Sequence, residues 1–401
     1  MDLRSGYAFW PIKNGLLCSY PYLESDVTCD VAVIGGGITG ALVSYYLVEA
    51  GFDTIVVDRR DIGAGSTSAS TALLQYEVDT PLCDLIEMVG RVNAARSYLL
   101  CLEAIAKLEQ LAERVGGETG FERKKSLYLA STSKDVGQLQ REYEARRAAG
   151  IGLDYLDRDD IRARFAFDYP AALLSHDGAQ VDPFRLMHQL FRVSSERGLR
   201  VYDRTEVSTV TYETNGVMLQ TDRGPRIRAR RVVMATGYES QQFVPQKIVT
   251  FHSSYALVSE PVRDFSGWGE DQCLIWETAR PYVYMRTTRD KRSLVGGEDD
   301  PFDNDEVRDR RIGKKTERLL ERFHSMFPAI TIEPAYSWAG TFGETKDGLA
   351  YIGQHPSFPH TYFALGYGGN GITYSHVAAE LIRDAMLGHP NPDADIFRFD
   401  R

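Results

Sequence analysis

Short apolar runs in this chain alternate with longer stretches in which apolar residues recur at helical spacing. Residues 29–36 (CDVAVIGG) and 54–58 (TIVVD) are continuous β-branched runs, typical of strands buried on both faces of a parallel sheet. Between them, residues 38–49 have the spacing of an amphipathic helix that should end near Gly51. The pattern therefore predicts a strand–helix–strand unit near the N-terminus.

Two further blocks have a different pattern, with helices followed by short strands. The first contains a long helical pattern from Asp84 to Val115, then a strand over 123–131 and a polar-faced helix over 135–150. The second is made mainly of strands, at 255–262, 272–278, 282–288 and 292–298, followed by a helix over 314–327. Strands backed by helices predict an antiparallel sheet that forms the floor of a pocket.

The turn after the first strand contains Gly35-x-Gly37-x-x-Gly40, the dinucleotide-binding pattern. Gly35 permits the tight turn, Gly37 lets the backbone approach a pyrophosphate, and Gly40 lets the helix pack closely on the strand. The helix N-terminus offers free N–H groups and partial positive charge to phosphates. Asp58, at the end of the second strand, is placed to accept a hydrogen bond from a ribose hydroxyl. This context favours a nucleotide site over a glycine-rich turn without ligand, but it does not separate NAD from FAD.

The segment over residues 59–77 (RRDIGAGSTSASTALLQYE) is rich in glycine and hydroxyl side chains. Such side chains can bind a second phosphate or a polyol chain, and FAD has a ribityl chain that NAD lacks. The alternative is a simple helix cap with a solvated turn.

Charge and cysteine content narrow the class of protein. The net charge of −10 argues against a nucleic-acid partner or an anionic membrane surface. No apolar run reaches ~18 residues, so no membrane span is expected, and the N-terminus lacks the pattern of a signal peptide. Five scattered cysteines without CxxC spacing are typical of reduced thiols, which favours a cytoplasmic protein. The histidines form no metal-binding pair, so no metal site is expected.

Five segments, in order, resemble the FAD-dependent oxidoreductases of the D-amino-acid oxidase superfamily, which includes glycine, sarcosine and gamma-glutamylputrescine oxidases. They are residues 30–70, 177–207, 231–240, 282–300 and 338–376. The resemblance implies an α/β fold with a Rossmann-like FAD-binding domain interleaved with an α+β substrate domain built on an antiparallel sheet. The implied boundaries are 27–81, 170–245 and 336–388 for the FAD-binding domain, 82–169 and 246–335 for the substrate domain, 1–26 for an N-terminal extension and 389–401 for a C-terminal tail.

The resemblance also implies which residues hold FAD. Asp58 stands where the family usually has glutamate, and it keeps the acceptor with one methylene fewer. The cysteine and histidine motifs that attach FAD covalently in some members are absent, so non-covalent FAD is expected. The implied cofactor residues are Gly35, Gly37, Ile38, Thr39, Gly40, Asp58, Arg59, Arg60, Gly65, Ser66, Thr67, Leu73, Leu74, Val207, Ala235, Thr236, Gly237, Gly340, Gly368, Gly369, Asn370, Gly371, Ile372 and Thr373.

A second glycine pattern, Gly366-x-Gly368-x-x-Gly371, lies near the end of the chain. A separate nucleotide site would need another strand ending in an acid about 20 residues beyond. That place holds a helix end and the proline-rich stretch AMLGHPNPDAD. We therefore interpret this turn as a cap on the flavin end of the same FAD.

The resemblance implies oxidation of a C–N bond in an amine or amino acid, with hydride transfer to flavin N5, hydrolysis of the imine, and O2 or another electron acceptor. Sarcosine-oxidase-like members carry one lysine that assists O2 and another that binds the substrate carboxylate. Leu294 and Thr373 stand in their places, which leaves oxidase or dehydrogenase open and weighs against a sarcosine-like substrate. The alternatives are a 2-hydroxy-acid or polyol dehydrogenase of the same superfamily, and a flavoprotein subunit active only in a complex.

Candidate substrate ligands lie in the second strand-rich block. Aromatic side chains can surround an amine cation and an arginine suits a carboxylate. Each of these residues could equally be an ordinary sheet residue, because strands favour Tyr and Trp. Gln75, Tyr76 and Glu77 are weaker candidates, and we interpret the acidic run 297–306 as a solvated loop. The candidates are Tyr255, Trp276, Tyr282, Tyr284 and Arg286.

Overall fold

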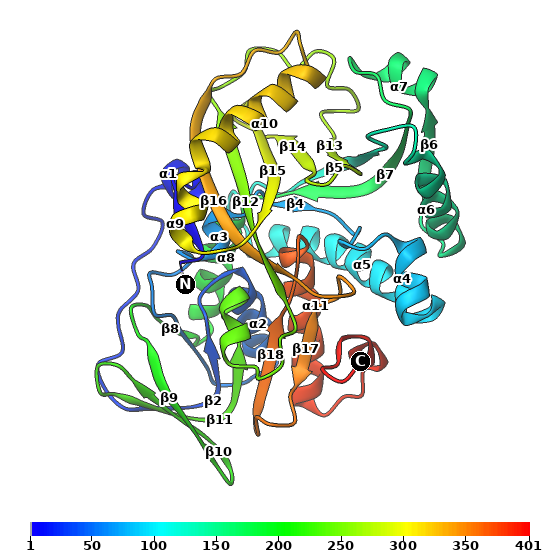
Figure 1. Cartoon of the computed structure of the whole chain (residues 1–401). Coiled ribbons are helices and arrows are strands. Elements are labelled where there is room, and N and C mark those ends of the chain that lie inside the picture. The colour runs from blue at the N-terminus through cyan, green and yellow to red at the C-terminus, as the bar shows by residue number, and fades with distance from the viewer. Residues whose placement is uncertain (1) are drawn as a thin grey trace.

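The computed structural model describes residues 2–401 and contains two sheets, one above the other in Figure 1. The lower, eight-stranded sheet has the order β17-β18-β11-β2-β3-β8, and the β9–β10 hairpin extends it from β11. Its strands are β2 (Val27–Ile34), β3 (Thr54–Val57), β8 (Arg200–Tyr202), β9 (Val207–Glu213), β10 (Gly216–Thr221), β11 (Arg226–Met234), β17 (Tyr351–Gln354) and β18 (Thr361–Leu365). The central pairings β18–β11, β11–β2, β2–β3 and β3–β8 are parallel, as the continuous apolar runs predict.

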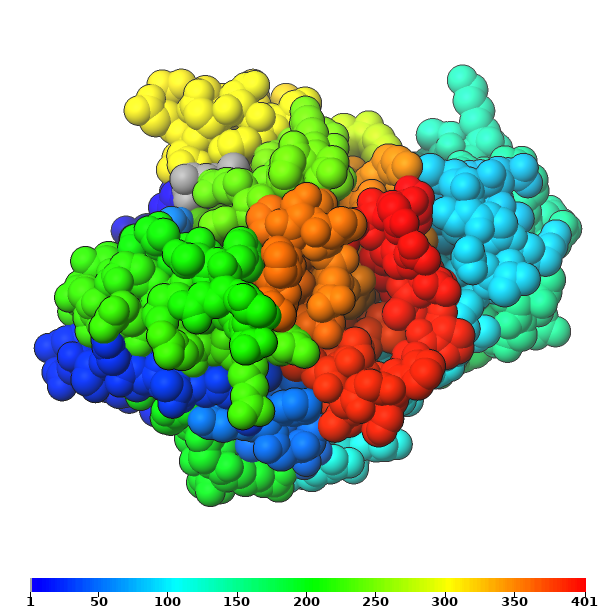
Figure 2. All heavy atoms as spheres, turned by 90° about the horizontal axis from the view of Figure 1, so that it is seen from below, coloured from blue at the N-terminus to red at the C-terminus, as the bar shows by residue number. Residues whose placement is uncertain are grey.

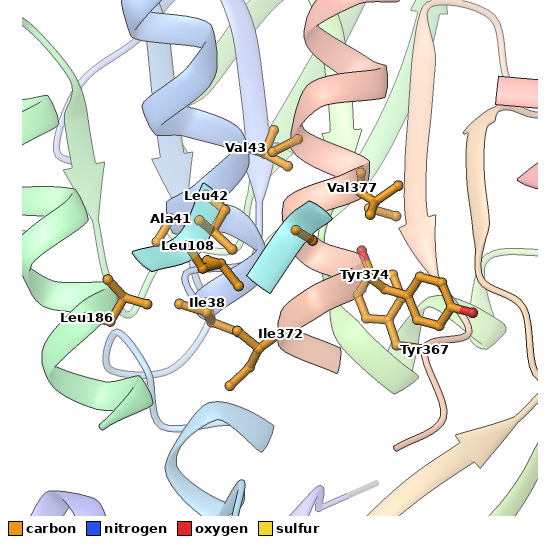
Figure 3. Close-up of a cluster of buried hydrophobic side chains, with 14 of the residues drawn as sticks. Ile38, Ala41, Leu42, Val43, Leu108, Leu186, Tyr367, Ile372, Tyr374 and Val377 are labelled. Atoms are coloured by element: carbon orange, nitrogen blue, oxygen red, sulfur yellow. The ribbon is translucent and has the colours of Figure 1, made fainter. Parts of the chain in front are cut away.

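Three helices pack together beside this sheet, namely α2 (Ile38–Glu49), α8 (Pro183–Ser195) and α11 (Gly371–Leu387). Nine of the 12 residues of α2 are buried, because the helix lies between the sheet and the other helices. Figure 3 shows Ile38 of α2 close to Ile372 of α11, so the first turns of these two helices meet. Their N-termini are therefore held near each other although more than 300 residues separate them in the chain.

The upper, ten-stranded sheet has the order β1-β16-β12-β15-β14-β13-β5-β7-β4, with β6 paired to β7. Its strands are β1 (Arg4–Gly6), β4 (Leu73–Leu74), β5 (Glu122–Leu129), β6 (Leu153–Asp157), β7 (Ala171–Gln180), β12 (Thr250–Ser259), β13 (Leu274–Glu277), β14 (Val283–Thr287), β15 (Ser293–Pro301) and β16 (Pro334–Glu344). Helix α10 (Ile312–Met326) packs on one face through Leu319 and Phe323. The other face of these strands is turned toward the eight-stranded sheet (Figure 1).

The remaining helices fill the space around the two sheets. They are α1 (Phe9–Asn14), α3 (Ser66–Ala69), α4 (Leu82–Val89), α5 (Arg91–Val115), α6 (Val136–Ala148), α7 (Arg158–Arg164), α9 (Asp305–Arg310) and the 3₁₀ segments η1 (Gly237–Gln242) and η2 (Pro392–Phe397). Within residues 2–401, no helix is both long and apolar enough to cross a membrane.

The structure differs from the sequence-based expectations at three places. The helix expected over Asp84–Val115 is two helices, because Gly90 has φ 81° and breaks the turn between α4 and α5. The acidic run 297–306 is no solvated loop, since β15 continues to Pro301 and α9 begins at Asp305. Strands β7 and β16 both belong to the ten-stranded sheet, so this sheet takes in residues after 170 and after 336 that were expected in the FAD-binding domain.

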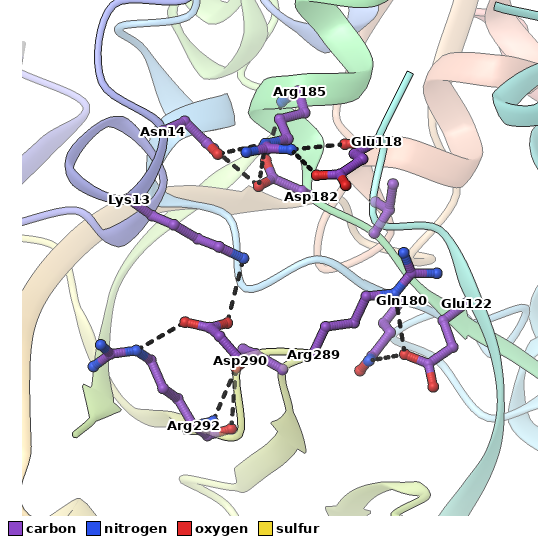
Figure 4. A network of polar contacts seen from close by, with 12 residues as sticks. Lys13, Asn14, Glu118, Glu122, Gln180, Asp182, Arg185, Arg289, Asp290 and Arg292 are labelled. Atoms are coloured by element: carbon purple, nitrogen blue, oxygen red, sulfur yellow. Dashed lines mark hydrogen bonds and ion pairs between the residues drawn. The ribbon is translucent and has the colours of Figure 1, made fainter. Parts of the chain in front are cut away.

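The N-terminal extension is tightly bound to the body of the protein. Strand β1 pairs with β16, and the side chain of Asn14 hydrogen-bonds both Asp182 (2.9 Å) and Arg185 (2.6 Å) at the start of α8. Lys13 reaches Asp290 on the turn between β14 and β15, at 3.4 Å, and Figure 4 shows these contacts together. The extension thus joins both sheets.

Beyond α1, the extension continues as an extended chain on the surface. Figure 2 shows this blue segment lying beside the green β9–β10 region. The Arg223 guanidinium lies 4.7 Å from the centre of the Tyr22 ring, and Asp203 donates its backbone N–H to Pro21 O at 3.0 Å. These contacts hold residues 15–26 against the edge of the eight-stranded sheet.

Candidate active site

A cavity of ≈ 1050 Å³ lies between the two sheets. It extends from the first turn of α2 and the loop around α3 to the first turn of α11, with β14 and β16 along its wall. Its size is that of a site for a large organic ligand. We describe it from its α2 end, which we call the phosphate end, to its α11 end, which we call the substrate end.

The first turn requires glycine where other parts of the backbone come too close for a side chain. A Cβ on Gly40 would overlap the carbonyl oxygen of Gly35, and a Cβ on Gly35 would overlap the carbonyl oxygen of Ala235. Gly35 also has φ 114°, which side chains other than glycine disfavour. The first N–H groups of α2 have no intrahelical acceptor, so the helix start offers donors and partial positive charge to a phosphate.

Asp58 and Thr67 fix the shape of this turn. Asp58 accepts the N–H of Gly36 at 2.7 Å and the N–H of Arg60 at 2.8 Å, one with each carboxylate oxygen. Burial raises the pKa of Asp58 above its ordinary value, and these two hydrogen bonds oppose that rise. Thr67 accepts the N–H of Ile38 at 2.9 Å. Asp58, the residue expected to bind the ribose, therefore also holds the glycine turn in place, and it lines the cavity.

Basic residues stand beside the phosphate end. Arg59 and Arg60 both pair with Glu239 in η1, and the Arg60 contact measures 2.7 Å. Glu239 follows the Ala235–Gly237 turn at the end of β11, so this pairing ties that turn to the end of β3. The result is a fixed cationic rim next to the first turn of α2.

The substrate end is built where the last glycine turn meets residues 75–79. Gly369 donates its N–H to Asp79 at 3.0 Å, and a Cβ on Gly368 would overlap the Asp79 carboxylate. The Asn370 side chain donates to the carbonyl oxygens of Gln75 (3.0 Å) and Glu77 (2.8 Å). The start of α11 and this loop therefore form one rigid corner.

A buried ion pair holds the loop of residues 75–79 in place. The Glu77 carboxylate is buried and accepts a hydrogen bond from Arg146 of α6 at 3.0 Å. Arg146 also pairs with Glu142 at 2.7 Å, so its charge is shared between two carboxylates. Breaking such a buried pair by removing one partner is costly, which makes the position of Asp79, two residues further on, well defined.

The cavity fits the FAD that the sequence predicts. It runs without interruption from the α2 turn to the α11 turn, and nearly all of the implied cofactor residues line it. Three of them do not. Gly40 lies behind the turn that it permits, Leu74 is packed in the core, and Thr373 uses its hydroxyl to donate to Asn370 O at 2.9 Å. These three residues help to shape the site without lining the cavity.

Four of the five candidate substrate residues line the cavity, namely Tyr255, Trp276, Tyr282 and Tyr284. Trp276 stacks on Tyr128, with ring centres 3.8 Å apart, and donates its N–H to Ser126 at 3.2 Å. Tyr282 and Tyr284 stand next to each other, with ring centres 5.7 Å apart. The Tyr284 ring lies over Gly296 of β15, where a Cβ would collide with it.

Two candidates have side chains that point away from the cavity, although Tyr255 is itself part of the lining. Tyr255 packs in the cluster beneath α10, with the Lys315 ammonium 5.3 Å from its ring centre, so its side chain lies on the far face of the sheet. Arg286 is only 2% exposed, lies 5.2 Å from the centre of a Trp10 ring, and donates to Val181 O at 3.3 Å. It is absent from the cavity lining, which has no buried arginine at this end within residues 2–401.

Sequence reasoning missed several charged and aromatic groups at the substrate end. Asp79, Glu344, Arg280 and Tyr238 line it, and Tyr238 donates its hydroxyl to Gly368 O at 2.8 Å. Burial and the neighbouring Glu344 carboxylate raise the pKa of Asp79 to about 7. Asp299 lies nearby, and burial raises its pKa to about 7 as well. No motif marks these positions. The alternation of side chains along a strand over 293–301 would, however, have placed Asp299 on the opposite face of the sheet from Glu298 and Asp300.

Comparisons with known proteins agree with this geometry. The family model described as FAD dependent oxidoreductase matches residues 30–385. The gamma-glutamylputrescine oxidoreductase of Escherichia coli (strain K12) is 26% identical over 394 residues, which cover 94% of this chain and 87% of the relative. The glycine oxidase of Geobacillus kaustophilus (strain HTA426) is 27% identical over 367 residues, which cover 89% of this chain and 92% of the relative.

Solved structures share the fold. The crystal structure of glycine oxidase from Geobacillus kaustophilus superposes with a TM-score of 0.77 at 23% identity, covering 91% of this chain and 96% of that one. Together with the family match over most of the length, this establishes the identity that the cavity suggests. The chain belongs to the FAD-dependent oxidoreductase family and uses FAD as its cofactor.

Proposed function

We propose that this enzyme oxidises a C–N bond of a small amine. The observation that carries the proposal is the composition of the substrate end, where Tyr282, Tyr284 and Trp276 stand beside the carboxylates of Asp79 and Glu344. Aromatic faces and carboxylates attract an amine cation. The names of the relatives, a gamma-glutamylputrescine oxidoreductase and a glycine oxidase, support the same substrate chemistry.

The residues of the chain divide the work between holding the cofactor and preparing the substrate. The first turns of α2 and α11 would hold FAD non-covalently at its two ends, and FAD when bound supplies the acceptor for the hydride. An amine must lose its proton before it can give up a hydride. The amine can lose this proton to solvent, so the reaction requires no base from the chain. The aromatic walls exclude water from the reacting carbon.

Anaerobic reduction of the flavin tests the proposal directly. The purified holoenzyme is mixed without O2 with a panel of amines, amino acids, 2-hydroxy acids and polyols, and bleaching of flavin absorbance is followed. Amines or amino acids should reduce the flavin. Reduction by hydroxy acids or polyols alone would contradict the proposal, and reduction by none would favour a subunit active only in a complex. Reoxidation by O2, compared with reoxidation by an artificial dye, then distinguishes oxidase from dehydrogenase.

A further inference from the structure

Carboxylates from three separate elements gather at the substrate end. Asp79 lies in the loop before α4, Asp299 in β15 and Glu344 at the end of β16. Asp79 and Glu344 line the cavity and Asp299 is buried behind it, and burial and the two neighbouring carboxylates raise the pKa of Asp79. Together with Tyr238, Tyr282 and Tyr284 they form what we call the acidic-aromatic pocket.

The direction of Asp299 follows from its neighbours in β15. Glu298 and Asp300 both contact Lys315 of α10, at 3.8 and 2.9 Å, so they lie on the α10 face of the sheet. Asp299, between them, is turned toward the cavity face of the sheet, where it lies behind the lining with Ser254 and Tyr284 as its neighbours. Its Oδ1 atom is buried and has no hydrogen-bond partner in the described part of the chain. A buried carboxylate oxygen without a partner is costly and is suited to a donor supplied by a ligand.

The one cation that lines the pocket, among residues 2–401, lies at its mouth. Arg280 is exposed, and its guanidinium lies 4.9 Å from the centre of the Tyr282 ring. This guanidinium donates a hydrogen bond to Ala279 O at 3.2 Å, a backbone acceptor rather than a carboxylate. The Tyr282 face therefore already attracts a cation from the mouth side. Arg286, the residue expected to bind a substrate carboxylate, is buried against Trp10 instead.

A single ammonium group on the substrate does not neutralise the negative charge of this pocket. Two carboxylates in the lining and a third behind it, when all are ionised beside a single substrate cation, leave excess negative charge in a site of low dielectric, which is unfavourable. A second cationic group on the same substrate would neutralise it and would occupy the aromatic faces. A substrate carboxylate beside the reacting carbon would be repelled, because the pocket offers it no buried cation within residues 2–401.

We propose that the acidic-aromatic pocket binds a second, non-reacting ammonium group of the substrate, so that the enzyme prefers a diamine or polyamine to an α-amino acid. This inference rests on the proposed oxidation of a C–N bond and names the substrate class for it. Asp79, Asp299 and Glu344 are specificity-determining residues that pair with this second cation.

The experiment compares 1,4-diaminobutane with 1-aminobutane and with glycine, in the holoenzyme under anaerobic rapid mixing. An early change in the flavin spectrum reports binding, and slower bleaching reports reduction. We expect 1,4-diaminobutane to bind about tenfold or more tightly than 1-aminobutane, and glycine to bind more weakly than both. Asp79→Asn and Glu344→Gln should each bring the ratio of the two amine affinities toward one. Asparagine keeps the acceptor for the Gly369 N–H, so the turn is preserved, and flavin content confirms that each variant holds FAD.

Glu87→Gln serves as the matched control, because Glu87 is an exposed carboxylate on α4 outside the cavity lining. This variant should keep the parental ratio. Equal affinities for the diamine and the monoamine, or tighter binding of glycine, would overturn the inference even if amines reduce the flavin. Tight diamine binding that depends on Asp79, without reduction by any amine, would support the pocket and contradict the proposed function, so the two failures are distinguishable.

Discussion

The two ends of the cavity are built in different ways. The phosphate end consists mostly of backbone from one local strand–turn–helix unit, closed by the turn after β11. The substrate end consists of side chains from the loop before α4, the strands β13 to β16, η1 and the α11 turn. Backbone recognition of a phosphate tolerates little change, whereas a wall of side chains from several segments can change its chemistry one residue at a time. The phosphate end, which binds the cofactor, should therefore tolerate few substitutions. Substitutions at the substrate end can change the substrate without changing the fold.

The largest expected effect comes from the phosphate end. In Gly40→Ala the new Cβ overlaps the Gly35 carbonyl oxygen, so the turn must open. Overpacking of this kind costs roughly 1–3 kcal/mol, which corresponds to about 5- to 150-fold weaker binding of FAD. The ratio of flavin to protein absorbance after purification measures it.

Gly137→Ala is the matched control, since Gly137 lies in α6 and a Cβ there would have no neighbouring atom within 4 Å. Alanine at this position should keep full flavin content and slightly stabilise the helix. Normal flavin content in Gly40→Ala would mean that the phosphate end is less rigid than its backbone contacts indicate.

The next effect tests whether the corner at the substrate end is as rigid. In Gly368→Ala the Cβ overlaps the Asp79 carboxylate, and φ 53° is unfavourable for alanine. We expect flavin reduction by the preferred amine to slow by about tenfold or more, with a smaller loss of FAD than in Gly40→Ala. Gly313→Ala, in α10 with open space around the new methyl group, should react like the parent. Equal behaviour of the two variants would show that Asp79 can move away freely.

A smaller effect concerns pH. Because the folded-state pKa of Asp79 is about 7, above its ordinary 3.8, the folded protein binds this proton more tightly than the unfolded chain. The stabilising contribution is therefore present below pH ~4 and is lost as the pH rises through about 7. Glu344, Asp299 and Arg280 are the charged groups that face Asp79. Thermal melting of the substrate-free holoenzyme should show Asp79→Asn gaining stability relative to the parent between about pH 5 and pH 8. A constant difference across that range would contradict the raised pKa.

The smallest effect concerns Arg286. It lies outside the cavity lining against Trp10 and makes one long hydrogen bond, so Arg286→Met should leave amine affinity within about twofold of the parent. Replacing a poorly paired buried charge with an apolar side chain of similar length should be neutral or stabilising. The same binding titration checks this. A large loss of affinity for amino acids would restore Arg286 as a carboxylate ligand.

Sequence alone could predict the family, the fold class and the cofactor, and the comparisons confirm all three. Local rules suffice there, because Gly35 to Gly40 and Asp58 lie in one continuous unit whose spacing reflects its geometry. The substrate end could not be predicted in the same way. Whether Tyr255 or Tyr284 faces the cavity depends on strand register, and the burial of Arg286 depends on Trp10, which is more than 270 residues away in the chain.

Pairing of distant segments also determines when the protein can first take up its cofactor during synthesis. Strand β2 needs β11 as a neighbour, β1 needs β16, and the α2 turn meets the α11 turn that begins at Gly371. Until the ribosome has made β11 and α11, the sheet that forms the phosphate end has an unpaired edge and its helix lacks a partner. FAD uptake should therefore follow the synthesis of α11, and a shortage of FAD would leave a folded chain whose central cleft is open.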